Sequence, residues 1–289
     1  MKIRSLAKIN LGLEVLRKRP DGYHDIRTLF QWIGLWDTLE FVPRSDGEIS
    51  LQGNDESIPW DGNNLVFRAA RLLREQAGVK SGLHIVVDKK IPAGRGLAGG
   101  SSNAAMTLYA LQKIWGLNLS GQELAGLGRR LGADVAYFFT GGLCLGEERG
   151  DKITPLSDLP RLACVLAIPP FPVSTAMIYG RLLPPALTSD DKDSKIIRFL
   201  EAGEFGFLEN RLEDTIFSFY PQLKDIKSLF RDQGAELSLV TGSGSAVFGL
   251  FPDREKAEKS LKEMRKHSVA LLVETVSRER GWSELDAGV

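Results

Sequence analysis

The sequence predicts a two-domain protein of the α+β class, for three reasons. Its 289 residues reach the length at which a single hydrophobic core usually stops growing. The pattern of the chain changes beyond about residue 155, where an apolar strand and a proline-rich turn precede a series of helical patterns. The final part predicts strand, turn, strand, helix and strand, which is an α+β arrangement. We therefore expect one domain at residues 1–155 and a second at residues 156–289.

The composition is that of a globular protein without an overall charge. Hydrophobic residues make up 43% and charged residues 26%, which suffices for a sizeable core. Lys+Arg and Asp+Glu both number 37, so we expect neither nucleic acid nor a membrane as a partner. No apolar run has the length of a signal peptide or a membrane span, and we expect a cytoplasmic protein, a monomer or weak homodimer. Cys144 and Cys164 lie in apolar segments, which predicts buried thiols in a reducing compartment.

The first part of the chain predicts two long strands and a helix. Residues 2–42 alternate around a turn at residues 19–22, which is typical of two strands joined by a tight connection. Residues 64–76 have apolar positions spaced as on an amphipathic helix, and Gly78 would end that helix. These elements would form the start of the N-terminal domain.

A strand, a loop and two helices are expected next. Residues 83–91 predict the strand and residues 103–115 the first helix. Ser120 and Glu123 form a capping box for the second helix, which Gly132 would end. Beyond residue 155 we expect a strand at 162–168, helices between 174 and 233, strands at 237–240 and 247–251 around a TGSGS turn, a helix at 254–266 and a strand at 269–274.

The stretch IPAGRGLAGGSSNAA at residues 91–105, the glycine-rich loop, places glycines and serines between a strand and a helix. Such a loop exposes backbone N–H groups and the positive end of a helix dipole, so it predicts a phosphate site. It contains G-x-G-x-x-G, but two helices follow where the dinucleotide fingerprint needs a second strand. It lacks the lysine that precedes the serine of a Walker loop, and the sequence lacks the HRD and DFG strings of protein kinases.

A third kind of phosphate loop remains. PAGRGLAGGSSNAA resembles the P-x-G-x-G-L-G-S-S loop of the GHMP small-molecule kinases, named for galactokinase and the homoserine, mevalonate and phosphomevalonate kinases. Two further blocks agree in order and position, AKINLG at residues 7–12 and TGSGSA at residues 241–246. The loop has Arg95 and Ala98 where related members commonly have a small residue and a glycine. An exposed arginine there could approach phosphate, but we expect the Arg95 side chain to be solvated.

The resemblance implies a two-domain GHMP kinase architecture. Its N-terminal domain would be similar to ribosomal protein S5 domain 2, and its C-terminal domain would be a ferredoxin-like α+β domain. ATP and the substrate would meet in a cleft between the domains, and Mg²⁺ would accompany the ATP. The sequence leaves the metal ligands unassigned, because His84 and His267 lack metal-ligand spacing and we interpret both as structural.

Asp134 and Lys8 are the predicted catalytic residues. The resemblance implies that Asp134, in GADVAYF, takes or orients the proton of the substrate hydroxyl. From the residues alone, a helix cap at Asp134 is an equal alternative. The resemblance also implies that Lys8 lies beside Asp134 and keeps its carboxylate ionised, whereas a lone lysine in a strand usually indicates a solvent-facing position.

Within the family, AKINLGL, RPDGYHDI, GGSSNAA and GADVAYF resemble members that phosphorylate a cytidine-diphosphate-linked polyol. The resemblance implies that Tyr23 stacks on the cytosine, that His24 hydrogen-bonds to its edge, and that Tyr179 closes the other side. Without it, Tyr23 and His24 would be residues flanking a turn, and TGSGS a flexible hairpin turn. The other residues implied in substrate binding are Asn10, Asn103, Thr241, Gly242 and Ser243.

For ATP, the resemblance implies an adenine site near Asn64, Leu65 and Lys89. From the residues alone, Asn64 would be a helix cap and Lys89 a solvated strand end. Three other hypotheses stay open: another GHMP kinase that acts on a smaller alcohol such as homoserine or mevalonate, a non-catalytic binding protein of the same fold, and an RNA-binding module. The loop residues implied in ATP binding are Pro92, Gly94, Gly96, Leu97, Ala98, Gly99, Gly100, Ser101 and Ser102.

Overall fold

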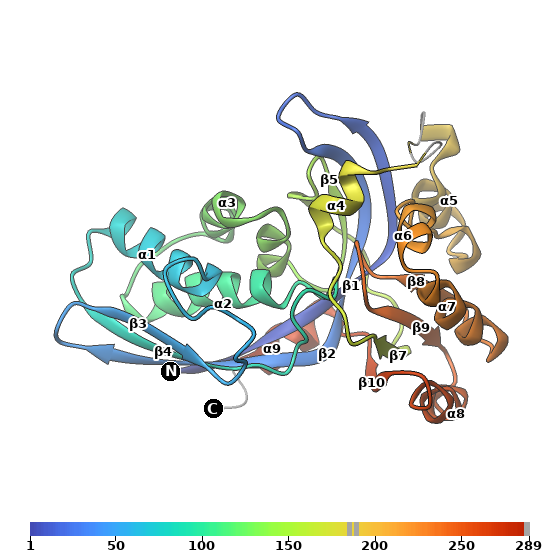
Figure 1. Ribbon diagram of the computed structural model, residues 1–289. Coiled ribbons are helices and arrows are strands. Elements are labelled where there is room, and N and C mark those ends of the chain that lie inside the picture. The colour runs from blue at the N-terminus through green and yellow to red at the C-terminus, as the bar shows by residue number, and fades with distance from the viewer. Residues whose placement is uncertain (184–186, 188–190, 286–289) are drawn as a thin grey trace.

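The computed structural model of the protein describes residues 1–183, 187 and 191–285. Within these ranges the chain forms two lobes, each built on one sheet (Figure 1). The sheet of the N-terminal lobe has six strands in the order β3-β4-β2-β5-β6, with β1 paired to β2. Its strands are β1 (Lys2–Lys18), β2 (His24–Arg44), β3 (Ile49–Gly53), β4 (Gly82–Asp88), β5 (Leu143–Glu147) and β6 (Lys152–Pro155).

The long antiparallel pair of β1 and β2 connects the two lobes. It confirms the two strands predicted around the turn at residues 19–22, with pairing from Lys2 and Glu40 to Lys18 and His24. The register shifts at three places along the pair, and such bulges bend a strand. Figure 1 shows the pair in blue, running from the N-terminal lobe to the tip of its own turn beside the C-terminal lobe.

Three helices and a 3₁₀ helix cover the N-terminal sheet; the first and third helices each bury one apolar face, whereas the second is buried on most sides. The predicted caps are confirmed: Asn64 and Gly78 bound the first helix, and the Ser120–Glu123 capping box starts the third. These elements are α1 (Leu65–Ala77), α2 (Gly99–Ile114), α3 (Gly121–Leu131) and the 3₁₀ helix η1 (Ala133–Phe139).

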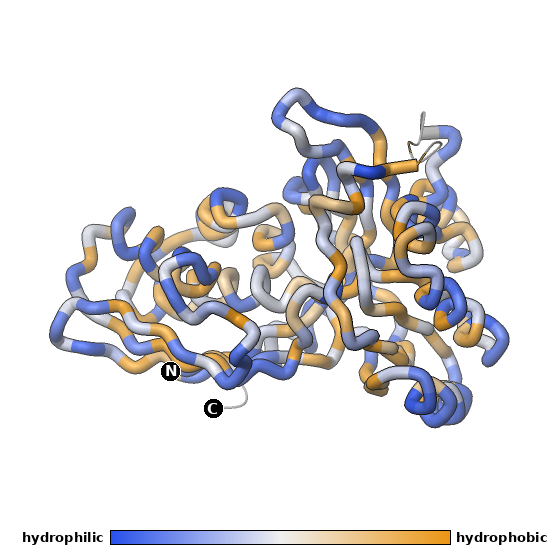
Figure 2. Tube along the Cα trace, in the orientation of Figure 1, coloured by the Kyte–Doolittle hydropathy of each residue, from blue (hydrophilic) through white to orange (hydrophobic). Residues whose placement is uncertain are grey.

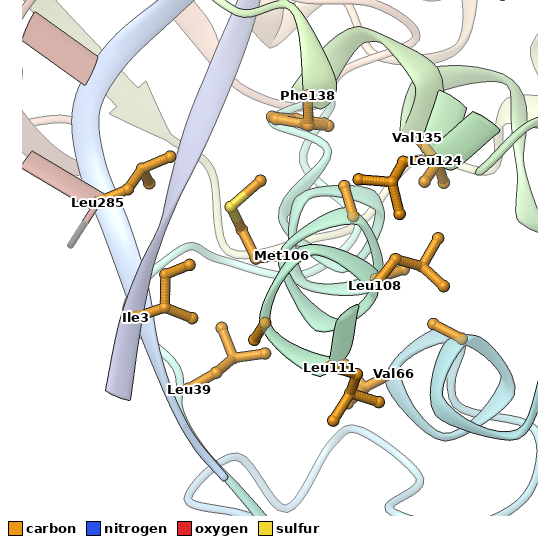
Figure 3. Packing of buried hydrophobic residues seen from close by; sticks show 14 of the residues in the cluster. Ile3, Leu39, Val66, Met106, Leu108, Leu111, Leu124, Val135, Phe138 and Leu285 are labelled. Carbon is orange, nitrogen blue, oxygen red and sulfur yellow. The ribbon is translucent and has the colours of Figure 1, made fainter. Parts of the chain in front are cut away.

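The core of the N-terminal lobe surrounds α2 (Figure 3). Met106 faces Ile3 and Leu39 of the sheet, and Leu108 and Leu111 face the neighbouring helices. The buried apolar side chains hold α2, and with it the end of the glycine-rich loop, rigidly against the sheet. Figure 2 shows hydrophobic residues along the strands of both lobes and hydrophilic residues on the outer loops.

The C-terminal lobe has a four-stranded antiparallel sheet within the described ranges, in the order β10-β7-β9-β8. If the strands of this lobe are numbered 1 to 4 along the chain, their order in the sheet is 4-1-3-2. This is the ferredoxin-like arrangement that was expected. Its strands are β7 (Ala163–Ile168), β8 (Leu237–Val240), β9 (Val247–Phe251) and β10 (Val269–Glu274), and its helices are α4 (Thr175–Gly180), η2 (Asp191–Asp193), α5 (Lys195–Ala202), η3 (Phe205–Phe207), α6 (Glu213–Phe219), α7 (Gln222–Asp232) and α8 (Arg254–Met264).

The last helix, α9 (Arg278–Leu285), leaves the C-terminal lobe and packs against β1. Its Leu285 is buried in the N-terminal core and Trp282 packs against that core. The predicted domain boundary at residue 155 therefore stays a prediction, because the last helix of the second predicted domain packs on the first lobe. Cys144 and Cys164 are buried free thiols, as expected, and no helix among the described residues is long and apolar enough to cross a membrane.

Two boundaries near the glycine-rich loop differ from the prediction. The strand ends at Asp88 rather than at residue 91, and α2 begins at Gly99 rather than at residue 103. The strand stops early because Asp37 of β2 accepts the N–H groups of Lys90 and Ile91, which a longer strand would have paired with its neighbour. Strands β3, β5 and β6 and helix α9 were not predicted.

Candidate active site

A cleft of about 1010 Å³ lies between the lobes. Both lobes line it, through β1, the glycine-rich loop and η1 on one side and α4 and the turn between β8 and β9 on the other. The predicted site residues that line it are Lys8, Asn10, Tyr23, His24, Asn64, Leu65, Lys89, Pro92, Gly94, Gly96, Ala98, Gly99, Gly100, Ser101, Asn103, Asp134, Tyr179, Gly242 and Ser243.

The structure does not place Leu97, Ser102 and Thr241 on the surface of this cleft. Leu97 is a buried core residue. The Ser102 hydroxyl is buried and donates to the backbone oxygen of Leu6 at 2.7 Å. Thr241 is buried, and its hydroxyl accepts Asn10 N–H from the other lobe at 3.0 Å.

The start of α2 lines the cleft. Ala98 precedes the helix in the left-handed conformation, with φ of 53°, and its methyl group offers no oxygen that could cap the helix. Gly99, Gly100 and Ser101 follow and line the cleft. The first amides of a helix lack intrahelical partners and carry the positive end of its dipole, so this surface suits a phosphate.

The glycine-rich loop is held against the β8–β9 turn, residues 241–246. The Thr241 hydroxyl lies 3.2 Å from the carbonyl oxygen of Gly96, and Ala246 N–H donates to the carbonyl oxygen of Arg95 at 3.2 Å. Gly96 has φ of 77°, and a Cβ atom there would lie 2.0 Å from the Thr241 carbonyl oxygen. The close approach of loop and turn therefore requires glycine at this position.

Asn210 fixes the other side of the β8–β9 turn. Its amide group donates to the carbonyl oxygens of Val240 at 2.8 Å and Gly242 at 2.7 Å, and its oxygen accepts Leu212 N–H at 3.0 Å. The side chain is 3% exposed, so these bonds are shielded from water. TGSGS is thus the hairpin turn that the residues alone indicate, but the surrounding contacts fix its position.

Asp37 anchors the beginning of the glycine-rich loop. Its carboxylate accepts Lys90 N–H at 2.7 Å and Ile91 N–H at 2.8 Å, and it forms an ion pair with Lys89. The Lys89 side chain is 5% exposed, so the alternative of a solvated strand end is wrong. Asp37 was not predicted, because an acidic residue inside a long strand gives no local signal.

Lys8 and Asp134 meet on the floor of the cleft. The Lys8 Nζ atom lies 3.5 Å from Oδ2 of Asp134, where 4% of the lysine side chain and 34% of the aspartate side chain are exposed. Burial lowers the pKa of Lys8, and the charge of Asp134 opposes that shift. Asp134 lies inside η1, whose N-cap residue is Gly132, so the alternative of a helix cap at Asp134 is wrong.

A chain of hydrogen bonds orients the lysine. Lys8 Nζ donates to Asn10 Oδ1 at 2.6 Å, and Asn10 Nδ2 donates to the Thr28 hydroxyl at 2.7 Å, which itself donates to Gly12 O at 2.7 Å. Asn10 N–H donates to the Thr241 hydroxyl at 3.0 Å. The lysine of one lobe is therefore connected through Asn10 to the turn of the other.

Aromatic side chains form the end of the cleft near the β1–β2 turn. The rings of His24 and Tyr179 have centroids 5.3 Å apart, and the Arg149 guanidinium lies 5.5 Å from the centre of the Tyr23 ring. Tyr23 is 57% exposed, so its side chain is accessible to a ligand. Burial lowers the pKa of His24, and the charge of Lys18 adds to the shift, so the neutral imidazole is favoured there.

A second apolar end lies near the start of α1. Asn64 caps α1 by accepting Val66 N–H at 2.9 Å, as the residues alone indicate, and it also lines the cleft. Leu65 and Trp60 line the same end. Trp60 packs over Gly53, where an added Cβ would lie 2.2 Å from its ring.

Sequence reasoning missed several lining residues. Arg149 and Trp60 come from connecting segments that carry no family motif. Thr175 forms a hydrogen bond with the Ser243 hydroxyl at 2.7 Å, but its position in the short helix α4 gives no local signal. Arg95 was singled out by its place in the glycine-rich loop and was expected to be solvated.

Two family models match the chain. GHMP kinases N terminal domain matches residues 64–142, and GHMP kinases C terminal matches residues 195–270. These ranges contain the glycine-rich loop, Asp134 and the β8–β9 turn.

Many curated proteins are similar over most of the chain. A 4-diphosphocytidyl-2-C-methyl-D-erythritol kinase from Syntrophus aciditrophicus is 42% identical over 90% of this chain and 93% of its own. One with the same name from Caldicellulosiruptor bescii is 37% identical over 98% of this chain and 100% of its own.

Solved structures of kinases are also similar to this chain. A crystal structure of 4-(cytidine 5'-diphospho)-2C-methyl-D-erythritol kinase superimposes with a TM-score of 0.82 at 36% identity, covering 95% of this chain and 99% of the other. A homoserine kinase from Cytophaga hutchinsonii has a TM-score of 0.74 at 18% identity, covering 97% of this chain and 96% of the other, a likeness of fold alone.

Proposed function

Since the chain belongs to the GHMP kinases, we propose that it transfers the terminal phosphate of ATP to the 2-hydroxyl of 4-diphosphocytidyl-2-C-methyl-D-erythritol. The reaction would serve the non-mevalonate synthesis of isoprenoid precursors. One relative that bears this enzyme's name shares 42% identity over nine-tenths of the chain. The observation that carries the proposal is the pair of Lys8 and Asp134, which shares one cleft with the start of α2 and with Tyr23 and His24.

The cleft divides into three parts with different chemistry. The apolar end at Asn64 and Leu65 suits the adenine, and the amides of α2 suit the phosphates of ATP. The aromatic end at Tyr23, His24 and Tyr179 suits a cytosine ring, which needs stacking surfaces and hydrogen-bonding groups. A smaller alcohol such as homoserine would leave these three aromatic side chains without a ligand, which favours the cytidylylated substrate.

Lys8 and Asp134 provide the groups that phosphoryl transfer needs. The Asp134 carboxylate, partly open to the cleft, accepts the proton of the attacking hydroxyl or orients it. The Lys8 ammonium, 3.5 Å from the carboxylate, attracts the hydroxyl oxygen as negative charge develops on it. Asn10 fixes the lysine, and its contact with Thr241 makes this arrangement depend on both lobes.

The donor set of the cleft fits Mg²⁺ bound mainly through ATP. Among the described residues, no cluster of three His, Cys, Asp or Glu side chains is present, and Ser101 and Asp134 supply hard oxygen donors that line the cleft. Mg²⁺ is commonly held by one or two carboxylates together with phosphates and water. When bound, it neutralises charge on the transferred phosphate.

The test is a measurement of ADP release with four candidate substrates at saturating Mg-ATP. These are 4-diphosphocytidyl-2-C-methyl-D-erythritol, the same polyol without cytidine diphosphate, homoserine and mevalonate. Turnover with the first alone is expected. Turnover with homoserine or mevalonate would keep the kinase chemistry and reject the substrate, and ATP binding without turnover of any of them would favour a non-catalytic protein.

A further inference from the structure

Arg95 carries a positive charge that the described part of the chain leaves uncompensated. It lies in the glycine-rich loop and lines the cleft. Its Nε and Nη1 atoms are shielded from solvent and have no hydrogen-bond partner among the described residues. Burial lowers the pKa of Arg95, with no acidic side chain raising it in return.

Two hydrogen bonds fix the backbone around Arg95 against the β8–β9 turn. Ala246 N–H donates to the Arg95 carbonyl oxygen at 3.2 Å, and the Gly96 carbonyl oxygen lies 3.2 Å from the Thr241 hydroxyl. Guanidinium N–H groups that are shielded from water and lack an acceptor are unfavourable, because they have lost their water without replacement. Such a group is expected where an anionic ligand completes its surroundings.

We propose that Arg95 binds a phosphate group of a bound ligand. The phosphate would then contact a cationic side chain as well as the backbone amides of α2. The proposal rests on the proposed function, which brings two phosphate-bearing molecules into this cleft. Both the triphosphate of ATP and the diphosphate of the cytidylylated substrate offer pairs of phosphate oxygens that the planar guanidinium can bind through two N–H groups. Arg95 is thus a specificity-determining residue for a phosphoanion.

Equilibrium binding of two probes distinguishes the two sources. A non-hydrolysable ATP analogue with Mg²⁺ reports the nucleotide site, and cytidine diphosphate reports the substrate diphosphate. Isothermal titration is carried out on the wild-type protein, Arg95→Met, Arg95→Lys and the control Arg231→Met. Arg231 lies exposed at the end of α7 and tests for a general effect of one lost positive charge.

Arg95→Met is expected to weaken one of the two probes by about tenfold to a hundredfold, the range of a charge-assisted hydrogen bond. Arg95→Lys should keep part of the affinity, and Arg231→Met all of it. The affinity of the wild-type protein should also fall more steeply with salt than that of Arg95→Met. Without ligand, Arg95→Met should melt at the same temperature as wild type or higher, because two shielded N–H groups without acceptors are removed.

Loss of affinity for the ATP analogue alone would assign the contact to ATP, and loss for cytidine diphosphate alone would assign it to the substrate. Affinities within twofold of wild type for both probes, in a folded Arg95→Met protein, would overturn the proposal. If the wild-type protein bound the ATP analogue but not cytidine diphosphate, the proposed substrate would be wrong, and the ATP arm alone would decide the role of Arg95.

Discussion

Replacement of Gly96 by alanine tests whether contact between the glycine-rich loop and the β8–β9 turn is needed for catalysis. The added Cβ would lie 2.0 Å from the Thr241 carbonyl oxygen. Carbon and oxygen atoms that are not bonded keep at least about 3 Å apart, so loop and turn would have to separate by about 1 Å. That separation would break the contact between the Thr241 hydroxyl and the Gly96 carbonyl oxygen.

Two effects of Gly96→Ala can be separated by size. The left-handed backbone at Gly96, with φ of 77°, costs an alanine about 1–2 kcal/mol of stability. A shift of about 1 Å in groups that position reactants costs about 10²-fold in rate. We therefore expect kcat to fall by about 10²-fold, beyond any loss from unfolding.

The matched control is Gly116→Ala. Gly116 also has a left-handed backbone, with φ of 64°, but an added Cβ would have nothing within 4 Å. Its variant should lose stability in urea unfolding and keep the wild-type kcat for ADP release. If Gly96→Ala kept kcat within threefold of wild type and lost only the stability that Gly116→Ala loses, the requirement for close contact between loop and turn would be refuted.

Three further predictions concern Lys8, Asn210 and Ala98. Burial lowers the pKa of Lys8 below its ordinary value of 10.5. The value of kcat/KM should therefore fall as the pH rises through that lowered pKa, because the ammonium beside Asp134 becomes neutral. If Lys8→Met kept the same fall at alkaline pH, the fall would belong to another group. Asn210→Ala leaves the carbonyl oxygens of Val240 and Gly242 without their donor. The free energy of unfolding in urea should fall by about 1–3 kcal/mol, and kcat should also fall. If neither value changed, the conformation of the β8–β9 turn would not depend on Asn210. Ala98→Gly removes the strain of a left-handed alanine before α2. The free energy of unfolding should rise by up to about 1 kcal/mol, with ATP binding unchanged. A loss of stability would mean that packing of the Ala98 methyl group stabilises the protein by more than this strain costs.

Local patterns predicted most of the fold, because the elements depend on spacing within a short window. The capping box at Ser120 and the glycine that ends α1 are confirmed, as are the bounds of β8, β9 and β10. The start of α2 was predicted four residues late, because glycine and serine have low helix propensity and tertiary packing of Gly99 overrides it. The helix α9 was missed because its partner, β1, lies at the other end of the chain.

Site residues that belong to a sequence motif were predicted. Site residues that are defined only by contacts between distant parts of the chain were missed. The pairing of Lys8 with Asp134 was expected from resemblance, and the structure places the two charges 3.5 Å apart. The ion pair of Asp37 with Lys89 joins β2 to the end of β4 and has no signature along the chain. The uncompensated charge of Arg95 is likewise visible only once its surroundings are known.

The most direct test of the account is a measurement of phosphate transfer by the wild-type protein and Asp134→Asn, side by side. ATP labelled in its terminal phosphate is mixed with 4-diphosphocytidyl-2-C-methyl-D-erythritol, and the labelled product is quantified, with binding of both ligands measured separately. The account predicts that wild type labels the polyol and that Asp134→Asn binds both ligands but is at least ~10²-fold slower. Transfer by Asp134→Asn at the wild-type rate would contradict the role of this carboxylate, and the absence of labelled polyol with wild type would contradict the proposed reaction.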